Sequence, residues 1–187
     1  MRLTFIAQNL KFGGFSDDDG AVQDRWPALL QRFKSVLEPA DFILLNEARD
    51  WEKQGHSPLA RAMDDLDMDA LPLAPSKTGQ HTGLLYRKET VGRWKHWNTA
   101  YAQEVTQSFG VAAFEVGLDA LLSVLPVHIT PFGSGKALEE ALLVASRGYR
   151  YGPYVVIGGD INYPPAHGPD PILDTDLIKN GDVRQYG

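Results

Sequence analysis

The stretch from Tyr154 to Asn162 constrains the fold more than any other part of the sequence. It begins with four β-branched or aromatic residues, 154–157, without polar alternation, which predicts a strand buried on both faces. Two glycines follow, and they allow close backbone packing. Because residues two apart in a strand point the same way, Asp160 and Asn162 would face one site together. A second interpretation is that Asp160 and Asn162 open a turn before the prolines that follow, and this stretch alone supports both interpretations equally.

The composition fits one soluble globular domain with a sizeable core. The chain has 187 residues, of which 43% are hydrophobic and 22% are charged, as is ordinary for such a domain. The longest apolar region, 111–129, is interrupted by two acidic residues and a proline, so no segment is expected to span a membrane. The first nine residues do not resemble a signal peptide.

The chain contains no cysteine, which excludes disulfides and thiolate metal sites. A cytoplasmic protein is therefore expected, and a cysteine-free secreted protein would have the same composition. The formal net charge is −6, whereas proteins that bind nucleic acid usually present a basic face. A modest basic cluster at 87–95 fits a solvated surface as well as a phosphate-contacting edge. The charge therefore weakens a nucleic-acid substrate without excluding one.

The first third of the chain indicates a layered α/β fold. An apolar strand ends at Asn9, helical spacing of apolar residues covers about 24–38, and a second buried strand ends at Glu47. A strand, a helix and a strand in this order favour a layered fold, in which sites tend to lie at strand ends. Asn9 and Glu47 are therefore candidate site residues.

The middle of the chain is predicted to consist of short strands. Residues 88–90 resemble a hairpin connection between two of them, and the last of these strands places His128 near its end. A helix is predicted at 134–147, with Leu138 and Leu142 on its apolar face. No linker or repeat is visible, so we expect a single domain over 1–187, with an irregular Pro- and Asp-rich tail at 163–187.

The polar residues at the predicted strand ends share a chemistry. They are Asn9, Glu47, His128, and Asp160 with Asn162. Carboxylates without cysteine suit a hard cation such as Mg²⁺ or Mn²⁺. Around a phosphodiester the metal would neutralise developing charge, a carboxylate would hold or deprotonate water, and Asn and His would donate hydrogen bonds. Each residue also has an ordinary structural alternative, such as a turn asparagine, a surface acid or a buried histidine.

Taken together, these segments resemble the endonuclease/exonuclease/phosphatase superfamily. That family includes deoxyribonuclease-I-like nucleases, abasic-site endonucleases and inositol or sphingolipid phosphodiesterases. The matching segments occur in the family's order, at 6–9, 40–47, 82–86, 126–128 and 156–162. The glycine–glycine–aspartate–any–asparagine element at 158–162 is the most specific of them, and the set of five in order is a strong match.

The resemblance implies an α/β (α+β) fold, a four-layered α/β/β/α sandwich of two mixed sheets with a divalent-metal-dependent phosphoesterase site where sheet ends meet. It implies that Glu47 ligates Mg²⁺ or Mn²⁺ and that Asn9 supports that centre. Asp160 would orient or activate the attacking water. Asn162 and His128 would contact the scissile phosphate.

The chain departs from the family pattern in two places. Lys11 stands where many nuclease members carry an acid, so the resemblance does not extend to a second metal contact there. The family also ends with an aspartate-bearing strand and a serine–aspartate–histidine motif, and neither follows Asn162 in this chain. We therefore expect a fold that is incomplete at the C-terminus. A fragment, a catalytically weakened relative and a chain completed by a partner would each explain this.

Three functional hypotheses follow from the sequence. The first is a Mg²⁺-dependent phosphodiesterase or nuclease that acts on DNA or on a smaller phosphoester. The second is a non-catalytic remnant that retains the fold and weak metal binding. The third is a structural α/β module without a site. The sequence does not choose among DNA, RNA, inositol and lipid phosphoesters, and it does not fix the oligomeric state.

Overall fold

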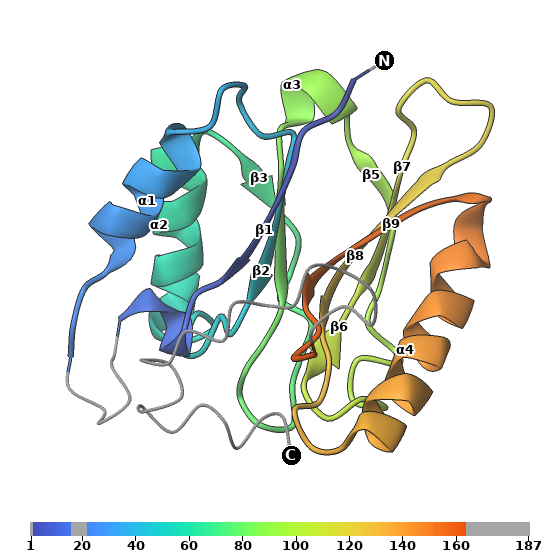
Figure 1. Cartoon of the computed structure of the whole chain (residues 1–187). Helices are drawn as coiled ribbons and strands as arrows, with labels where there is room; N and C mark the ends of the chain where they lie inside the picture. The colour runs from blue at the N-terminus through green and yellow to red at the C-terminus, as the bar shows by residue number, and fades with distance from the viewer. Residues whose placement is uncertain (1, 16–21, 164–187) are drawn as a thin grey trace.

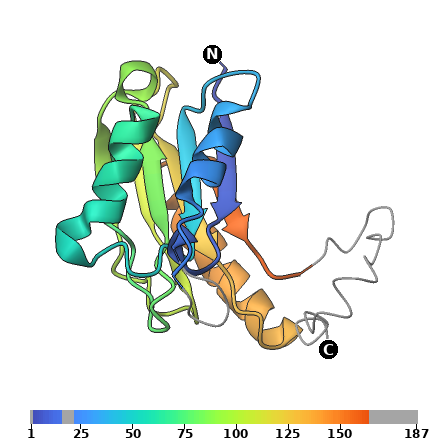
Figure 2. The same ribbon diagram turned by 90° about the vertical axis from the view of Figure 1, so that its left-hand side faces the viewer.

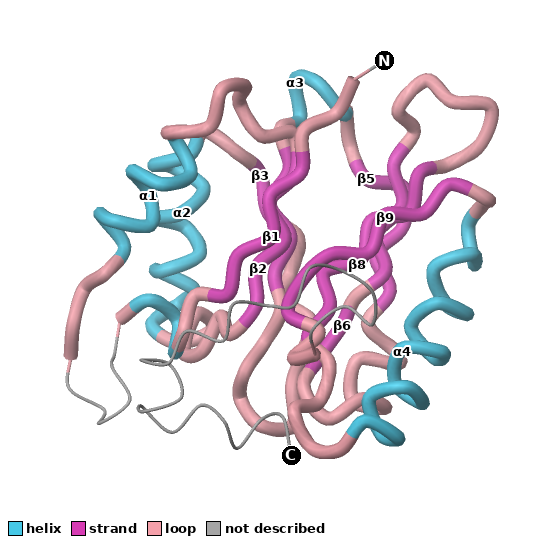
Figure 3. Tube along the Cα trace, viewed as in Figure 1, coloured by secondary structure: helices cyan, strands magenta, loops and turns pink. Residues whose placement is uncertain are grey.

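The protein is a mixed α/β structure with two β-sheets (Figure 1; Figure 3 separates helices from strands by colour). The computed structural model describes residues 2–15 and 22–163. The predicted tail therefore lies outside the described residues, apart from Tyr163. Within the described ranges, no helix is long and apolar enough to cross a bilayer.

The first sheet has four strands in the order β1-β2-β4-β3. They are β1 (Phe5–Asn9), β2 (Phe42–Asn46), β3 (Asp69–Ala70) and β4 (Gly83–Tyr86). β1 is parallel to β2, and the other pairs are antiparallel. Two helices, α1 (Trp26–Lys34) and α2 (Ser57–Leu66), cover the side that faces away from the second sheet (Figures 1 and 2).

The second sheet has five strands, with β9 parallel to β8 and the other pairs antiparallel. They are β5 (Trp94–Asn98), β6 (Ser108–Phe109), β7 (Val111–Phe114), β8 (Leu122–His128) and β9 (Tyr154–Asp160). The long helix α4 (Ser134–Gly148) lies against its outer side (Figure 1). Short helical turns complete the described chain: η1 (Phe12–Gly14), η2 (Gln54–His56), α3 (Lys88–Val91) and η3 (Tyr149–Tyr151).

Strand β2 is buried on both faces because it lies between two hydrophobic clusters. Ile43 and Leu45 pack into the cluster that contains side chains of α1 and α2. Phe42 and Leu44 alternate with them and pack into the cluster between the two sheets. A third cluster joins the second sheet to α4, for example through Val144. The prediction of a two-sided buried strand ahead of Glu47 is confirmed.

The prediction that 154–157 forms a strand buried on both faces is wrong in its burial. β9 pairs only with β8 among the described residues, and Tyr154 and Ile157 are 37% and 44% exposed. An apolar run of β-branched residues suits an edge strand as well as a central one. Which of the two positions it takes depends on the strands that other parts of the chain supply.

Two local predictions in the middle of the chain are also wrong. Residues 88–90 do not form a hairpin connection, because α3 joins β4 in the first sheet to β5 in the second. Helix α4 forms as predicted, but Leu138 and Leu142 are 61% and 63% exposed. Its buried face contains Ala137, Glu140 and Val144 instead. Because the buried face includes a charged residue, the spacing of apolar residues does not identify it.

Candidate active site

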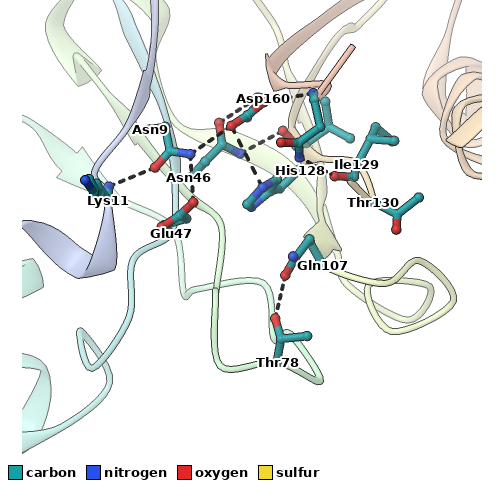
Figure 4. A network of polar contacts seen from close by, with 12 residues as sticks. Asn9, Lys11, Asn46, Glu47, Thr78, Gln107, His128, Ile129, Thr130 and Asp160 are labelled. Atoms are coloured by element: carbon teal, nitrogen blue, oxygen red, sulfur yellow. Dashed lines mark hydrogen bonds and ion pairs between the residues drawn. The ribbon is translucent and has the colours of Figure 1, made fainter. Parts of the chain in front are cut away.

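Four of the predicted site residues meet where strand ends of the two sheets face each other. Asn9 ends β1, Glu47 follows β2, His128 ends β8 and Asp160 ends β9 (Figure 4). One ligand atom from each of Glu47, His128 and Asp160 lies within 4.8 Å of the other two. The predicted convergence of polar strand ends is therefore present in the structure.

Asn46 holds the two sheets together at this end. Its side-chain Nδ2 donates a hydrogen bond to the carbonyl oxygen of Val127 at 2.7 Å. Its Oδ1 accepts the backbone N–H of Asp160 at 2.9 Å. The residue is 1% exposed, so both bonds form away from water, where an unpaired partner is costly. Asn46 thereby fixes the backbone of Asp160, from which the carboxylate projects, relative to β2.

The two glycines before Asp160 allow this close approach. A Cβ on Gly159 would lie 1.9 Å from the carbonyl oxygen of Val127 and 2.9 Å from Oδ1 of Asn46. Its φ of 147° is also one that other residues rarely adopt. A Cβ on Gly158 would meet Cδ2 of Leu44 at 3.2 Å. The close packing predicted at these glycines is confirmed.

Asn9 links the two carboxylates. Its Nδ2 donates to Oε1 of Glu47 at 2.9 Å and to Oδ2 of Asp160 at 2.8 Å. Its own Oδ1 accepts the backbone N–H of Lys11 at 2.8 Å, which fixes the orientation of the amide. One amide group thus brings two like charges to the same place. A position where two carboxylates converge favours a bound cation.

Glu47 is held in an uncommon backbone conformation. Its φ is 55°, in a region that non-glycine residues rarely enter. Its Oε2 accepts the backbone N–H of Phe12 at 3.0 Å, and its carbonyl oxygen accepts that of Gly13 at 2.7 Å. Such backbone strain clusters at functional sites, where the surrounding contacts maintain it. Here the segment 11–14 maintains it and aims the carboxylate toward Asn9.

His128 is almost fully enclosed, with 3% of its surface exposed. Its Nε2 lies 4.0 Å from Oδ2 of Asp160, and its Nδ1 is buried without a hydrogen-bond partner. Burial lowers the pKa of the imidazole below its ordinary value of 6.5, while the charges of Asp160, Glu47 and Glu140 act in the opposite direction. Because burial dominates, the neutral imidazole is the favoured form at neutral pH.

Asn162 does not face the site in the way that strand alternation predicted. β9 ends at Asp160, and Asn162 has a φ of 55°. Its backbone N–H donates to Oδ1 of Asp160 at 2.9 Å, and its Nδ2 donates to the carbonyl oxygen of Ile129 at 2.7 Å. The residue therefore orients the Asp160 carboxylate and fastens it to the end of β8. Its predicted phosphate contact stays a prediction.

Three polar residues close to the site were not identified from the sequence. Asn46 supports it from within β2, and a polar residue in an otherwise apolar strand was the available signal. Glu140 is 2% exposed and accepts hydrogen bonds from Thr106 and from the backbone of Thr130, beside the end of β8. Gln107 is 9% exposed and directly precedes β6. No sequence signal singled out Glu140 or Gln107.

The donor set fits a hard divalent cation. The carboxylate oxygens of Glu47 and Asp160 are ligands that Mg²⁺ and Mn²⁺ prefer. The imidazole of His128 lies within the same 4.8 Å group, and an imidazole nitrogen is compatible with Mn²⁺ as a borderline cation. Asn9 keeps both carboxylates in place through its N–H groups. Glu47 is therefore the residue that would hold the metal, with the carboxylate of Asp160 beside it.

Comparison with solved structures identifies the fold. The chain matches humanized D. rerio TDP2 (16% identity, TM-score 0.59), with 96% of this chain and 66% of that one covered. It matches the human Nocturnin catalytic domain with bound sulfate at 12% identity and a TM-score of 0.56, with 88% of this chain and 66% of that one covered. It matches ANGEL2 at 14% identity and a TM-score of 0.51, with 84% of this chain and 48% of that one covered. No model of a known family and no curated protein matches the sequence.

The chain therefore has the endonuclease/exonuclease/phosphatase fold. It spans 66% of the length of the TDP2 and Nocturnin chains. At 12% to 16% identity the likeness concerns the fold alone.

Proposed function

We propose that this chain is a divalent-metal-dependent phosphodiesterase. The observation that supports this most directly is the group of Glu47, His128 and Asp160, whose ligand atoms lie within 4.8 Å of one another. Asn9 bridges the two carboxylates of that group. The group lies at strand ends in a fold shared with ANGEL2, a 2',3'-cyclic phosphatase. The position of this group in the fold and the chemistry of its ligand atoms therefore both support a metal-dependent phosphodiesterase.

The proposed roles follow from the contacts. Glu47 would hold Mg²⁺ or Mn²⁺, and Asn9 keeps the carboxylates of Glu47 and Asp160 oriented toward each other. A bound metal supplies positive charge that stabilises the negative charge developing on the phosphoryl oxygens. His128, neutral because of its burial, donates a hydrogen bond to an oxygen of the scissile phosphate without adding charge.

Asp160 is the proposed general base. Its Oδ1 is oriented by the N–H of Asn162, and its Oδ2 by the amide of Asn9. In the reaction, a water oxygen attacks phosphorus while Asp160 takes one water proton. The bond from phosphorus to the leaving ester oxygen breaks, and that oxygen takes a proton from solvent. The products are a phosphomonoester and an alcohol, and Asp160 then returns its proton to solvent.

The structural neighbours favour a nucleotide phosphoester as substrate. One D. rerio TDP2 structure contains a single strand DNA product, and the ANGEL2 structure contains adenosine-2',3'-vanadate. The net charge of −6 disfavours a long polyanion. We therefore propose a short or single-stranded phosphodiester as the substrate.

The three hydrophobic clusters also support the four-layered α/β/β/α sandwich as the architecture of the domain.

The experiment measures hydrolysis of bis(p-nitrophenyl) phosphate by the full chain after EDTA treatment, with and without added Mg²⁺ or Mn²⁺. We expect turnover only with metal. Asp160→Asn is expected to lower turnover by about 10²-fold to 10⁴-fold, as loss of a general base does. Glu47→Gln should abolish the rise in melting temperature that metal produces in the wild type. Glu139→Gln, an exposed acid of α4, is the matched control and should change neither quantity.

Metal-induced stabilisation without turnover would support the non-catalytic alternative and end the proposal. Turnover that persists in EDTA would contradict the metal dependence. Absence of both stabilisation and turnover would favour the structural module.

A further inference from the structure

Gln107 is a polar residue beside the site that the roles above do not use. Its surface is 9% exposed, and it directly precedes β6. The next residue, Ser108, pairs with His128 across the sheet. Figure 4 shows Gln107 between His128 and Thr78. The glutamine therefore lies next to the strand end that brings the imidazole into the site.

Only one half of the Gln107 amide has a partner. Its Oε1 accepts the hydroxyl hydrogen of Thr78 at 2.5 Å. Thr78 is fixed in turn by Ser76, whose Oγ accepts the Thr78 backbone N–H at 3.1 Å and lies 2.9 Å from its hydroxyl. In the part of the chain that the structure describes, Nε2 of Gln107 has no hydrogen-bond partner. Because Nε2 is not among the fully buried polar atoms that lack a partner, it remains accessible to a ligand.

We propose that Nε2 of Gln107 donates a hydrogen bond to a non-bridging oxygen of the bound phosphodiester, and this rests on the function proposed above. Thr78 is the positioning residue, because its hydroxyl donates a hydrogen bond to Oε1 and so directs Nε2, on the other side of the amide, away from Thr78. A donor that is oriented before the substrate arrives stabilises charge in the transition state without reorganisation. Gln107 therefore contributes to the reaction as well as to binding.

The neutral donor also indicates which phosphoester the site takes. A phosphodiester has one negative charge, whereas a phosphomonoester near neutral pH approaches two. The cluster already contains the carboxylates of Glu47 and Asp160, with Glu140 acting on the same imidazole. Apart from the charge that a bound metal would supply, the amides of Gln107 and Asn9 add no positive charge to offset a second anionic oxygen. The site is therefore selective for diesters over monoesters.

The first test compares Gln107→Ala, Thr78→Val and Thr78→Ser with the wild type on bis(p-nitrophenyl) phosphate and on p-nitrophenyl phosphate, with Mg²⁺. Gln107→Ala should lower kcat for the diester by about 10²-fold, as loss of one such donor does, and leave the Mg²⁺ dependence of the melting temperature unchanged. Thr78→Val should lower it less, and Thr78→Ser should retain the wild-type rate. Gln103→Ala, an exposed glutamine of the same loop, is the matched control.

The second test does not depend on turnover. In the Asp160→Asn variant with Mg²⁺, bis(p-nitrophenyl) phosphate should shift the side-chain amide NMR signals of Gln107 and leave those of Gln103 in place. A Gln107 amide that does not move overturns the inference, whatever the rates. A wild type without turnover ends the proposed function, and the amide shift then decides separately whether Gln107 binds the phosphodiester. Wild-type rates in Gln107→Ala, with Asp160→Asn inactive, overturn the inference and leave the function standing.

Discussion

Oδ1 of Asn46 accepts the backbone N–H of Asp160 at 2.9 Å, across 114 positions of sequence. This bond joins β2 of the first sheet to β9 of the second, directly before the Asp160 side chain enters the site. The catalytic carboxylate proposed here is thus placed by a buried amide of the opposite sheet.

Replacing Asn46 should therefore impair both stability and the site. Asn46→Ala leaves the N–H of Asp160 and the carbonyl of Val127 without their partner, and an unsatisfied buried group costs about 1–3 kcal/mol. We expect a loss of that size in the free energy of unfolding, measured by urea titration. Asn98→Ala, which removes a local hydrogen bond from the N–H of Ala100 and a long 3.5 Å bond to the hydroxyl of Tyr151, should lose less than half as much. Equal losses would contradict the role of Asn46.

The two glycines before Asp160 should respond differently to alanine. Gly159→Ala places a Cβ against the Val127 carbonyl at a positive φ and should destabilise the fold by about 3 kcal/mol or more, from overpacking and strain together. Gly158→Ala meets the end of the Leu44 side chain at 3.2 Å and Cβ of Ala7 at an ordinary contact distance of 3.8 Å, and about 1 kcal/mol is expected. Thermal unfolding would measure both.

Gly135→Ala is the control for this pair. A Cβ there meets nothing within 4 Å, and alanine favours a helix over glycine by up to about 1 kcal/mol. A Gly159→Ala protein as stable as this control would show that the close approach of β9 to β8 and β2 is not required.

The buried imidazole predicts a pH dependence of stability in the absence of metal. Burial lowers the pKa of His128 in the folded state below the ordinary value of 6.5. Below that value the unfolded chain takes up a proton that the folded chain does not, so the free energy of unfolding falls as the pH falls. Above pH 6.5 the imidazole is neutral in both the folded and the unfolded chain, so the contribution of His128 to the free energy of unfolding no longer changes with pH.

Urea titrations in EDTA at pH 7.5 and pH 5.5 would measure this effect. The wild type should lose more stability between the two than His128→Asn, because the variant has no imidazole to protonate. His96→Asn, at an exposed position of β5, should behave like the wild type. A His128→Asn variant with the same pH dependence as the wild type would contradict the assignment.

Glu140 should be required for the end of β8 to keep its place. It accepts the N–H of Thr130 at 2.9 Å, and both the N–H and the hydroxyl of Thr106, at 2.8 Å and 2.6 Å. In Glu140→Gln an amide N–H₂ group faces donors, so at least one bond is lost, at about 1–3 kcal/mol. Glu139→Gln, its exposed neighbour, should remain within about 0.5 kcal/mol of the wild type, as measured by chemical unfolding.

Local chemistry predicted much of the site. Asn9, Glu47 and His128 were identified because each follows an apolar run at a strand end, and the structure brings them together with Asp160. The spacing argument for Asn162 was wrong because β9 stops at Asp160 and the chain turns at a positive φ. A periodicity of two holds only while the strand continues.

The sequence by itself determined most of the strands and the helices α1 and α4, and that polar residues interrupt or end several strands, because these depend on neighbouring residues and on spacing. Only the tertiary structure decided that β9 is an edge strand, that α4 buries Glu140 rather than Leu138, and that Asn46 and Gln107 support or line the site. These features depend on contacts between residues far apart in the chain. Burial and hydrogen-bond satisfaction are properties of the packed molecule, so no local pattern contains them.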